Sequence, residues 1–169
     1  MASIPLANGQ SVLVDDADYE MLSHWKWSVA GRGYPIRGQY KQGKTRTVYM
    51  HRQLLLPDPG VEIDHINGDI LDNRRENLRP ASRQQNSSNQ IPRVRSSRYK
   101  GVSRWLDTGR WQAHIKSDYE TTRIGYFKDE VDAALAYDVA ALRLFGEFAR
   151  PNFLQIERRI ERNQPTEAP

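Results

Sequence analysis

The stretch from Glu62 to Asn89 holds the side chains best suited to chemistry in this chain. Asp64 and His65 stand side by side, and Asn86 follows in a segment that begins with a serine. A carboxylate and an amide oxygen can hold one hard metal ion, and a neighbouring imidazole can take a proton from water. Hydrolysis of a phosphodiester needs an activated water and a neutralised phosphate charge. The pattern therefore predicts a phosphodiester-cutting site, with an ordinary surface strand end as the alternative.

The elements around this site must satisfy a geometric condition. Adjacent side chains on a regular strand point to opposite faces, so a strand that carries Asp64 and His65 has to end or twist there if both serve one site. Asn67 and Gly68 allow such a turn. Ser82 is the expected N-cap of a short helix, from which the amide oxygen of Asn86 can turn toward Asp64.

Composition narrows the class of protein. The chain has 169 residues, enough for one medium domain or two small ones, and its 38% hydrophobic content predicts small cores. The net charge is +4, and the segment from Asn77 to Leu106 carries seven Arg or Lys residues with no Asp or Glu. A concentrated basic stretch suits a polyanion such as nucleic acid, although a solvated linker is the alternative.

Several other classes are excluded. The chain has no cysteine, which removes disulfides, thiolate zinc sites and cysteine nucleophiles. The first residues show no basic segment followed by an apolar run, and no stretch approaches the roughly 20 apolar residues of a membrane-spanning helix. We therefore expect a soluble, cytoplasmic protein with no membrane association.

The first fifty residues predict a small, mostly β scaffold. Asn8 and Gly9 mark the turn of a hairpin over Ser3–Val14. Asp15 and Asp16 cap a short helix through Leu22, with Tyr19, Met21 and Leu22 expected to face inward. Strands are expected over 25–29, 34–37 and 45–50, with Trp25 and Trp27 burying one face, and a short apolar helix over His51–Leu56.

The C-terminal half predicts three strands followed by one long helix. The strands are expected over 99–105, 110–116 and 121–127, and the helix over 128–145, with Asp129 as its N-cap and Gly146 just past its end. The fold class is α+β. The expected divisions are a domain over 1–89, a basic linker over 90–97, a domain over 98–153 and a charged tail over 154–169. The expected apolar stripe of the helix is Val131, Ala134, Leu135, Val139, Leu142 and Phe145.

The runs DHINGD, LDNRRENLR and QN, between Asp64 and Asn86, resemble the HNH nucleases of the phage and intron-homing branch, with their ββα-metal finger. The resemblance covers roughly His51 to Asn89. It implies that Asp64 binds the metal, that His65 is the general base, and that Asn77 holds the loop and orients His65. Asn86 stands where many relatives have histidine and is the expected second ligand, with its neighbours Gln85 and Asn89 as alternatives. An amide oxygen at this position favours one Mg²⁺ or Mn²⁺ ion over zinc.

Other residues of this stretch keep two interpretations. His51 either contacts phosphate or only packs, and Asn73 is a turn former or, alternatively, a ligand. Arg79 and Arg83 are expected to grip backbone phosphates, as are Arg93 and Arg95 of the linker. Arg74 and Arg75 are expected to grip phosphates in the same way, with a solvated face as the alternative. The resemblance implies products with 5′-phosphate and 3′-hydroxyl ends.

The strand over 110–116 alternates polar and apolar side chains. Trp111, Ala113 and Ile115 form the face expected to meet the helix, and the opposite polar row is spaced by roughly 7 Å. On a sheet in a DNA major groove, arginine reads guanine and glutamine reads adenine. The polar row is Arg110, Gln112, His114 and Lys116, and we expect Lys100, Arg104, Trp105 and Arg123 to extend this surface.

The runs YKGVSRW, GRWQAHI and GYFKDEVDAALAYDVAA resemble the DNA-binding domain of plant ethylene-response transcription factors of the Apetala type. That resemblance covers about Arg98 to Phe153 and implies three antiparallel strands on one helix, with the sheet in the major groove. Ser103 and Arg123 depart from residues common in those factors, so the target sequence does not carry over.

The two resemblances together imply a site-directed, homing-type DNA endonuclease with one divalent metal ion per active site. Its partner is double-stranded DNA, of a phage or of bacteria, and we expect a monomer that needs no protein partner. The alternative is a DNA-binding transcriptional regulator whose nuclease part is inactive.

Overall fold

The computed structural model describes residues 1–90 and 96–153. The chain divides into two compact units, Met1–Asn86 (unit 1) and Ser87–Pro169 (unit 2). The division falls three residues before the expected boundary at residue 89. Most of the expected basic linker, and the tail over 154–169, lie outside the described residues. Ser97, expected in the linker, is buried in unit 2 and donates to Glu130 Oε1 over 2.7 Å.

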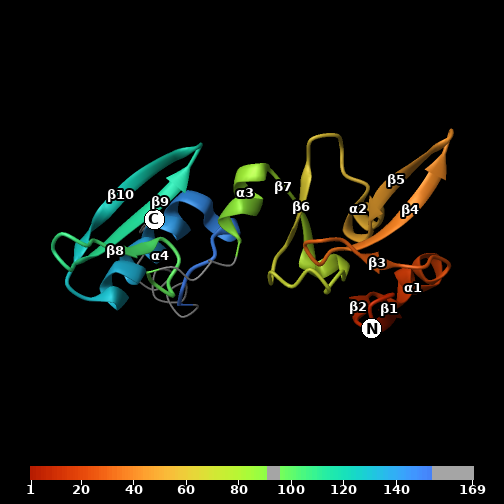
Figure 1. The fold of residues 1–169 in the computed structure, drawn as a ribbon, viewed down its shortest axis with the longest axis horizontal. Helices are drawn as coiled ribbons and strands as arrows, with labels where there is room; N and C mark the ends of the chain where they lie inside the picture. Colours follow the sequence, from red (N-terminus) through yellow and green to blue (C-terminus); the bar gives the residue numbers. More distant parts are fainter. Residues whose placement is uncertain (91–95, 154–169) are drawn as a thin grey trace, which may run out of the picture. The chain divides into compact units, whose positions relative to one another are not determined.

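Unit 1 begins with the predicted hairpin, β1 (Ala2–Pro5) paired with β2 (Ser11–Val14) (Figure 1). Helix α1 follows directly at Asp16–Ser23. The next elements form a three-stranded antiparallel sheet with β4 in its centre, and α2 closes this scaffold. Their bounds are β3 (Ser28–Val29), β4 (Pro35–Lys41), β5 (Lys44–Tyr49) and α2 (Met50–Leu55).

The core of unit 1 gathers alternate residues of the first hairpin with single residues from the elements that follow. The most deeply buried are Val12, Val14, Leu22, Trp27 and Met50. This apolar cluster also includes residues of α2, β6 and β7, so it holds in place the elements that carry the candidate site.

Two packing predictions in unit 1 are wrong. Tyr19 and Met21 are 42% and 43% exposed, because the two-turn helix α1 buries only the stripe of Asp18 and Leu22. Trp25 is 46% exposed, and the Arg37 guanidinium covers its ring at 4.1 Å, so only Trp27 of the pair enters the core.

The C-terminal part of unit 1 has the order strand, strand, helix. β6 (Glu62–His65) pairs with β7 (Leu78–Ala81) in an antiparallel ladder, and a short 3₁₀ turn, η1 (Arg75–Asn77), precedes β7. Helix α3 (Arg83–Ser88) follows and crosses the division between the units. Strand β6 therefore ends at His65, as the joint use of Asp64 and His65 requires.

Unit 2 has the predicted three-stranded antiparallel sheet, with β9 in its centre and α4 packed on one face. Its strands are β8 (Val102–Arg104), β9 (Trp111–Ser117) and β10 (Glu120–Phe127). Helix α4 (Glu130–Phe145) starts at Asp129, whose side chain accepts from Val131 N over 2.7 Å, and the turn η2 (Gly146–Phe148) follows it.

The predicted apolar stripe of α4 is partly wrong. Val131 and Leu135 are 40% and 37% exposed, whereas Ala133, Ala134, Tyr137 and Ala141 face the sheet. Alanine allows a helix backbone to approach a sheet closely, so the small side chains, not the large ones, set the buried face.

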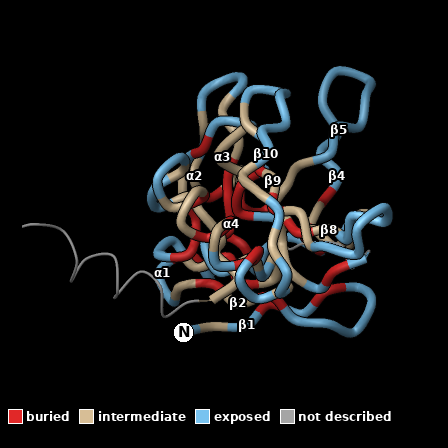
Figure 2. The backbone as a smooth tube through the Cα atoms, turned by 90° about the vertical axis from the view of Figure 1, so that its left-hand side faces the viewer, coloured by how far each residue is buried: buried red, intermediate tan, exposed pale blue. Residues whose placement is uncertain are grey.

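The α+β class is confirmed by these small antiparallel sheets and few helices. Figure 2 shows the buried residues of the backbone as short red segments, with exposed turns around them. Within the described residues no helix combines the length and apolar character needed to cross a lipid bilayer.

Candidate active site

The β6–β7 ladder positions the two residues that the sequence singled out. Asp64 lies opposite Arg79, and His65 lies opposite Leu78. Both Asp64 and His65 are buried, and the chain turns away immediately after His65 through Gly68, whose φ is 78°. The site is therefore built at the end of a strand.

Asn77 holds the loop that connects β6 to β7. Its Oδ1 accepts from Asn67 N over 2.9 Å, and its Nδ2 donates to the Asp72 carbonyl over 2.8 Å. The Asn77 carbonyl also accepts from Ile66 N over 2.9 Å. One buried amide thus ties both ends of the loop next to His65, which supports the predicted holding role of Asn77.

Further polar contacts stabilise the same loop. Arg74 makes a bidentate ion pair with Asp72, in which Nε donates to Oδ1 over 2.8 Å and Nη2 donates to Oδ2 over 2.7 Å. This pairing lowers the pKa of Asp72. Asn73 is fully buried, and its Nδ2 donates to the Ile70 carbonyl over 3.0 Å. This contact favours the turn-forming interpretation of Asn73. Arg75, for which a solvated face was the alternative, pairs with buried Asp18 at 2.8 Å.

Asp64 is held by an arginine from the facing strand. Nε and Nη2 of Arg79 lie 2.9 and 2.8 Å from Asp64 Oδ2, and the two side chains are 13% and 4% exposed for Arg79 and Asp64. Arg79 was expected to grip backbone phosphates, and in the structure its guanidinium pairs with Asp64 across the ladder. Arg83, on α3, is exposed.

Asn86 faces β6 from the short helix α3. Its Nδ2 donates to Glu62 Oε2 over 2.6 Å. Glu62 and Asp64 are two residues apart on β6, so their side chains leave the same face of the strand. Ser82 caps this helix as predicted: Ser82 Oγ accepts from Gln85 N over 3.2 Å, and Gln85 Oε1 accepts from Ser82 N over 2.7 Å.

His65, at the end of β6, lies in a cluster of rings whose other members come from β5, α2 and the segment before β4. The ring centroids of His51 and Tyr34 lie 5.3 and 6.0 Å from that of His65. His51 also stands 5.3 Å from Tyr34 and 5.6 Å from Tyr49. His51 therefore packs against the predicted base, and its buried Nδ1 has no hydrogen-bond partner among the residues that the structure describes.

Burial keeps both imidazoles neutral near pH 7. It lowers the pKa of His51 to about 3, with neighbouring His65 and Arg52 acting in the same direction. Burial also lowers the pKa of His65, although the Asn73 side chain and the carboxylates of Asp64, Asp69 and Asp72 oppose this. Burial raises the pKa of Tyr34, so its hydroxyl stays protonated.

A cavity of about 480 Å³ opens beside this cluster within unit 1. Its walls come from the segment before β4, the start of α2, strand β6 and Asn86. Cationic Arg32 and Arg52 and anionic Glu62 share this space, so it offers both phosphate-binding and metal-binding groups. The remaining lining residues include Tyr34, Tyr49, His51 and Ile63.

The donor set fits a hard cation better than zinc. Within residues 1–90 and 96–153, no group of three or more His, Cys, Asp or Glu side chains could hold a metal ion by itself. Asp64, Glu62 and Asn86 offer only oxygen, and Mg²⁺ is commonly held by one or two carboxylates with water and phosphate in the remaining positions. The residues fit one such ion.

The outer face of the unit 2 sheet gathers most of the residues predicted to read DNA. The register places Gln112 opposite Tyr126, His114 opposite Arg123, and Lys116 opposite Thr121, all turned away from α4. Arg123 Nη1 donates to the Tyr126 hydroxyl over 3.2 Å. The rings of Trp105 and Tyr126 pack edge to face, with centroids 5.6 Å apart. Arg110 precedes β9 and is exposed.

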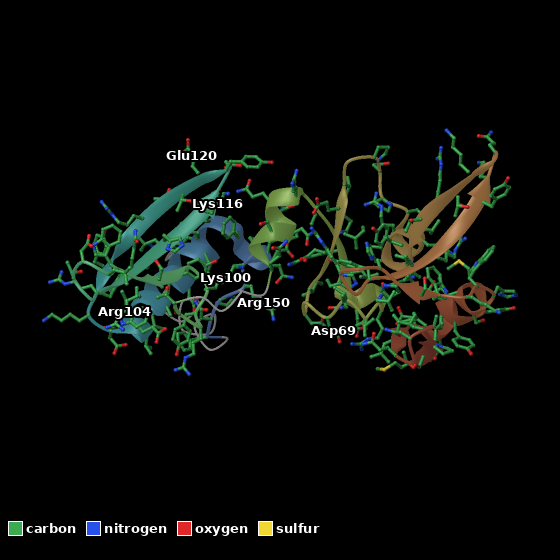
Figure 3. All side chains as sticks on the ribbon, in the orientation of Figure 1. Asp69, Lys100, Arg104, Lys116, Glu120 and Arg150 are labelled. Atoms are coloured by element: carbon green, nitrogen blue, oxygen red, sulfur yellow. The ribbon has the colours of Figure 1, made fainter. Side chains whose placement is uncertain are left out.

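Two residues of that prediction lie elsewhere. Arg104 pairs with Trp111 in the β8–β9 ladder, which puts it on the helix side of the sheet and near the opposite end of β9 from Lys116 (Figure 3). Lys100 donates through Nζ to the Ser88 carbonyl, and its backbone N donates to Asn152 Oδ1 over 2.6 Å, so it braces unit 2. Arg93 and Arg95 lie outside the described residues.

Sequence reasoning missed Glu62, Tyr34 and Arg52. The spacing of Glu62 from Asp64 on one strand was a signal that could have identified it. Tyr34 and Arg52 carried no such signal, because only the tertiary fold brings them to the site.

Both parts of the chain are similar to known proteins. The profile of a family described as HNH endonuclease matches residues 55–88. An uncharacterized HNH endonuclease of Acanthamoeba polyphaga mimivirus is 34% identical over 137 residues, which are 79% of this chain and 70% of that relative.

The C-terminal part is similar to plant proteins. An AP2-like ethylene-responsive transcription factor of Arabidopsis thaliana, TOE2, is 38% identical over 77 residues, or 46% of this chain. An AP2/ERF and B3 domain-containing protein of Oryza sativa subsp. japonica is 52% identical over 58 residues, or 34% of this chain. The chain spans 16% of the length of each of these two relatives.

Proposed function

The chain belongs to the HNH endonuclease family, and we propose that it is a site-directed DNA endonuclease in which unit 1 cuts and unit 2 holds the target. The observation that carries the proposal is the placement of Asp64 and His65 at the end of β6, beside Asn86, Glu62 and a cavity lined by arginines. This arrangement joins a proton acceptor, a set of oxygen donors and phosphate-binding cations.

His65 is the proposed general base. A base must be unprotonated before the reaction, and the burial that lowers the pKa of His65 keeps its imidazole neutral near pH 7. The rings of His51 and Tyr34 limit its rotation, since both lie within about 6 Å of it. Asn77 supports the same geometry by holding the loop that follows β6.

Asp64 and Asn86 are the proposed ligands of one Mg²⁺ or Mn²⁺ ion, with Glu62 adjacent. When bound, such an ion neutralises charge on the phosphate and stabilises the leaving oxygen. Arg79 holds the Asp64 carboxylate in place, and Glu62 holds the Asn86 amide through its Nδ2, which leaves the Asn86 carbonyl oxygen as the ligand atom.

The sheet of unit 2 is the proposed DNA reader. Its outer face carries Gln112, His114 and Lys116 on β9 and Arg123 on β10, with Arg110 just before β9. These side chains can bond to base edges in a major groove. The similarity to plant transcription factors supports a DNA-binding role, and a sequence-reading module is what a homing-type nuclease needs to recognise a long target.

The test is cleavage of supercoiled DNA by the full chain with Mg²⁺ or Mn²⁺. We expect nicked or linear product from the wild type and from His24→Ala, an exposed histidine control, and none from His65→Ala. His65→Ala should still retard DNA on a gel. A wild type that binds DNA but leaves it uncut with both ions would contradict the proposal and favour a DNA-binding regulator.

A further inference from the structure

A second basic segment of unit 1 lies outside the proposed site. From Met21 to Pro57 the chain carries no Asp or Glu and seven Lys or Arg residues. A segment of this length with one sign of charge generates a positive potential over the surface that it covers. The seven cations are Lys26, Arg32, Arg37, Lys41, Lys44, Arg46 and Arg52.

The centre of this segment is the β4–β5 hairpin, which extends beyond the other elements of unit 1 (Figure 1). Its tip, residues 38–47, is exposed at every position (Figure 2). The tip turns through Gln42 and Gly43, with φ values of 51° and 77°. An isolated two-stranded hairpin is only marginally stable in water, so a tip that buries nothing gives the fold little. Its exposure therefore suits a surface that contacts a partner.

The strand register collects the cations of the tip on one face. Gln39 lies opposite Arg46, and Lys41 lies opposite Lys44. Directly paired residues project from the same side of a ladder, and positions two apart share that side. The other face carries Gly38, Thr45 and Thr47, with Tyr40 at 75% exposure as its one large side chain. The hairpin tip is thus two-sided, with a cationic face and an uncharged face.

The base of the hairpin is anchored, and it adjoins the cavity of the proposed site. Arg37 precedes Gln39 by two residues on β4 and lies on the same face. It is buried, its Nε donates to Gln53 Oε1 over 2.9 Å, and its guanidinium covers the Trp25 ring. The residues just before β4, including Arg32 and Tyr34, line the cavity. So do Tyr49 at the end of β5 and the first residues of α2. A polyanion that enters the cavity therefore passes the base of the hairpin.

We propose that the β4–β5 tip is a DNA-contacting arm of unit 1. Lys41, Lys44 and Arg46 bind backbone phosphates of the double-stranded substrate next to the cleavage point, and Gln39 faces the base edges. The major groove of B-form DNA admits a two-stranded β-ribbon, whereas the deep, narrow major groove of an RNA duplex does not. The identity of the partner rests on the proposed nuclease function, and the charged face rests on the register and exposure alone.

The experiment measures binding without cleavage. The full chain is titrated into a fluorescently labelled DNA duplex by anisotropy, in EDTA, over a series of salt concentrations. The triple variant Lys41→Ala, Lys44→Ala, Arg46→Ala should lose on the order of tenfold or more in affinity and flatten the plot of log affinity against log salt by about 2.7, since each phosphate contact contributes about 0.9.

Two matched variants separate local contacts from other effects. The variant Lys128→Ala, Arg143→Ala removes two positive charges from exposed sites outside this basic segment, and it should keep the wild-type salt slope. The variant Lys41→Arg, Lys44→Arg, Arg46→Lys keeps the charge and should also keep that slope. A melting curve for each variant checks that unit 1 remains folded.

The outcomes distinguish the arm from the nuclease function. If the tip variant keeps the wild-type salt slope and the wild-type protein cuts DNA, the arm proposal fails while the nuclease proposal stands. A flattened slope in a protein that cuts no DNA supports the arm while the nuclease proposal fails. Loss of affinity for an RNA duplex equal to that for DNA overturns the assignment of the partner as double-stranded DNA.

Discussion

The imidazole rings of His51 and His65 meet edge to face, with centroids 5.3 Å apart and planes at 80°. One ring comes from α2 and the other from the end of β6, so two separate elements fix the orientation of the proposed base. The interpretation of His51 as a packing residue accounts for this contact, and its place on the cavity wall leaves it within reach of a substrate as well.

The buried imidazoles predict a pH-dependent stability. His51 keeps a pKa of about 3 in the fold, against 6.5 in an unfolded chain, so between these values the unfolded state binds more protons. The contribution of neutral His51 to the free energy of unfolding is therefore complete above about pH 6.5. It declines as the pH falls toward 3, by up to about 1.4 kcal/mol per pH unit. Urea unfolding at pH 7 and pH 5, followed through methyl signals of the Val12 and Val14 core, measures this.

His51→Gln should unfold with a smaller difference between pH 7 and pH 5 than the wild type. Exposed His24→Gln serves as the control and should keep the wild-type difference. An equal pH dependence in His51→Gln and the wild type would contradict the assignment of the effect to His51.

The ion pair between Arg79 and Asp64 predicts a large cost when its arginine is removed. Arg79→Met leaves a buried carboxylate without this partner and should lower the free energy of unfolding by roughly 3–5 kcal/mol. Added Mg²⁺ should restore part of that loss, because a cation can replace the guanidinium charge. If Mg²⁺ restores as much of the free energy of unfolding in the double variant Asp64→Asn, Arg79→Met, the ion acts at another place.

Glu62 is predicted to act through Asn86. Glu62→Ala removes the acceptor of Asn86 Nδ2 and should raise the Mn²⁺ concentration for half-maximal cleavage by about 10–100-fold, as is typical when a partner of a metal ligand is lost. Glu62→Gln keeps an acceptor oxygen and should lose less. Exposed Glu76→Gln is the charge-matched control, and a Glu62→Ala enzyme with wild-type metal dependence would rule this role out.

The outer face of the unit 2 sheet is predicted to set target preference. Arg110→Ala and Arg123→Ala should each reduce discrimination between preferred and random DNA by about 1–3 kcal/mol, while slow, non-specific nicking continues. Arg143→Ala, on an exposed position of α4, should leave preference unchanged. The readout is competition between the two DNAs in cleavage and in gel retardation, and equal loss of selective and non-selective cutting would mean that this sheet does not read the sequence.

Gly101 is predicted to be essential for the packing of unit 2. Its φ is 72°, and a Cβ there would lie 1.9 Å from Tyr137 Cδ2 and 2.7 Å from the His114 carbonyl. Gly101→Ala should therefore destabilise unit 2 by roughly 1–3 kcal/mol or more. Gly109→Ala, at a similar φ of 68° in open space, bears only the backbone strain of roughly 1 kcal/mol. Thermal unfolding that ranks the two variants equally would contradict the crowding.

The sequence by itself determined the local features of the fold and the order of the site residues. The turn after His65, the capping serine at Ser82 and the start of α4 at Asp129 depend on contacts between residues a few positions apart. Such contacts leave readable patterns, because residue type and spacing suffice to specify them. The α+β class follows from the same local signals.

Only the tertiary structure decided which side chains surround those residues. The pairing of β6 with β7 turned Arg79 from an expected phosphate contact into the partner of Asp64. The packing of α2 against the end of β6 put His51 beside His65, and the β8–β9 register moved Arg104 off the reading face. These neighbours are set by burial and register between distant segments, and composition and periodicity do not encode them one residue at a time.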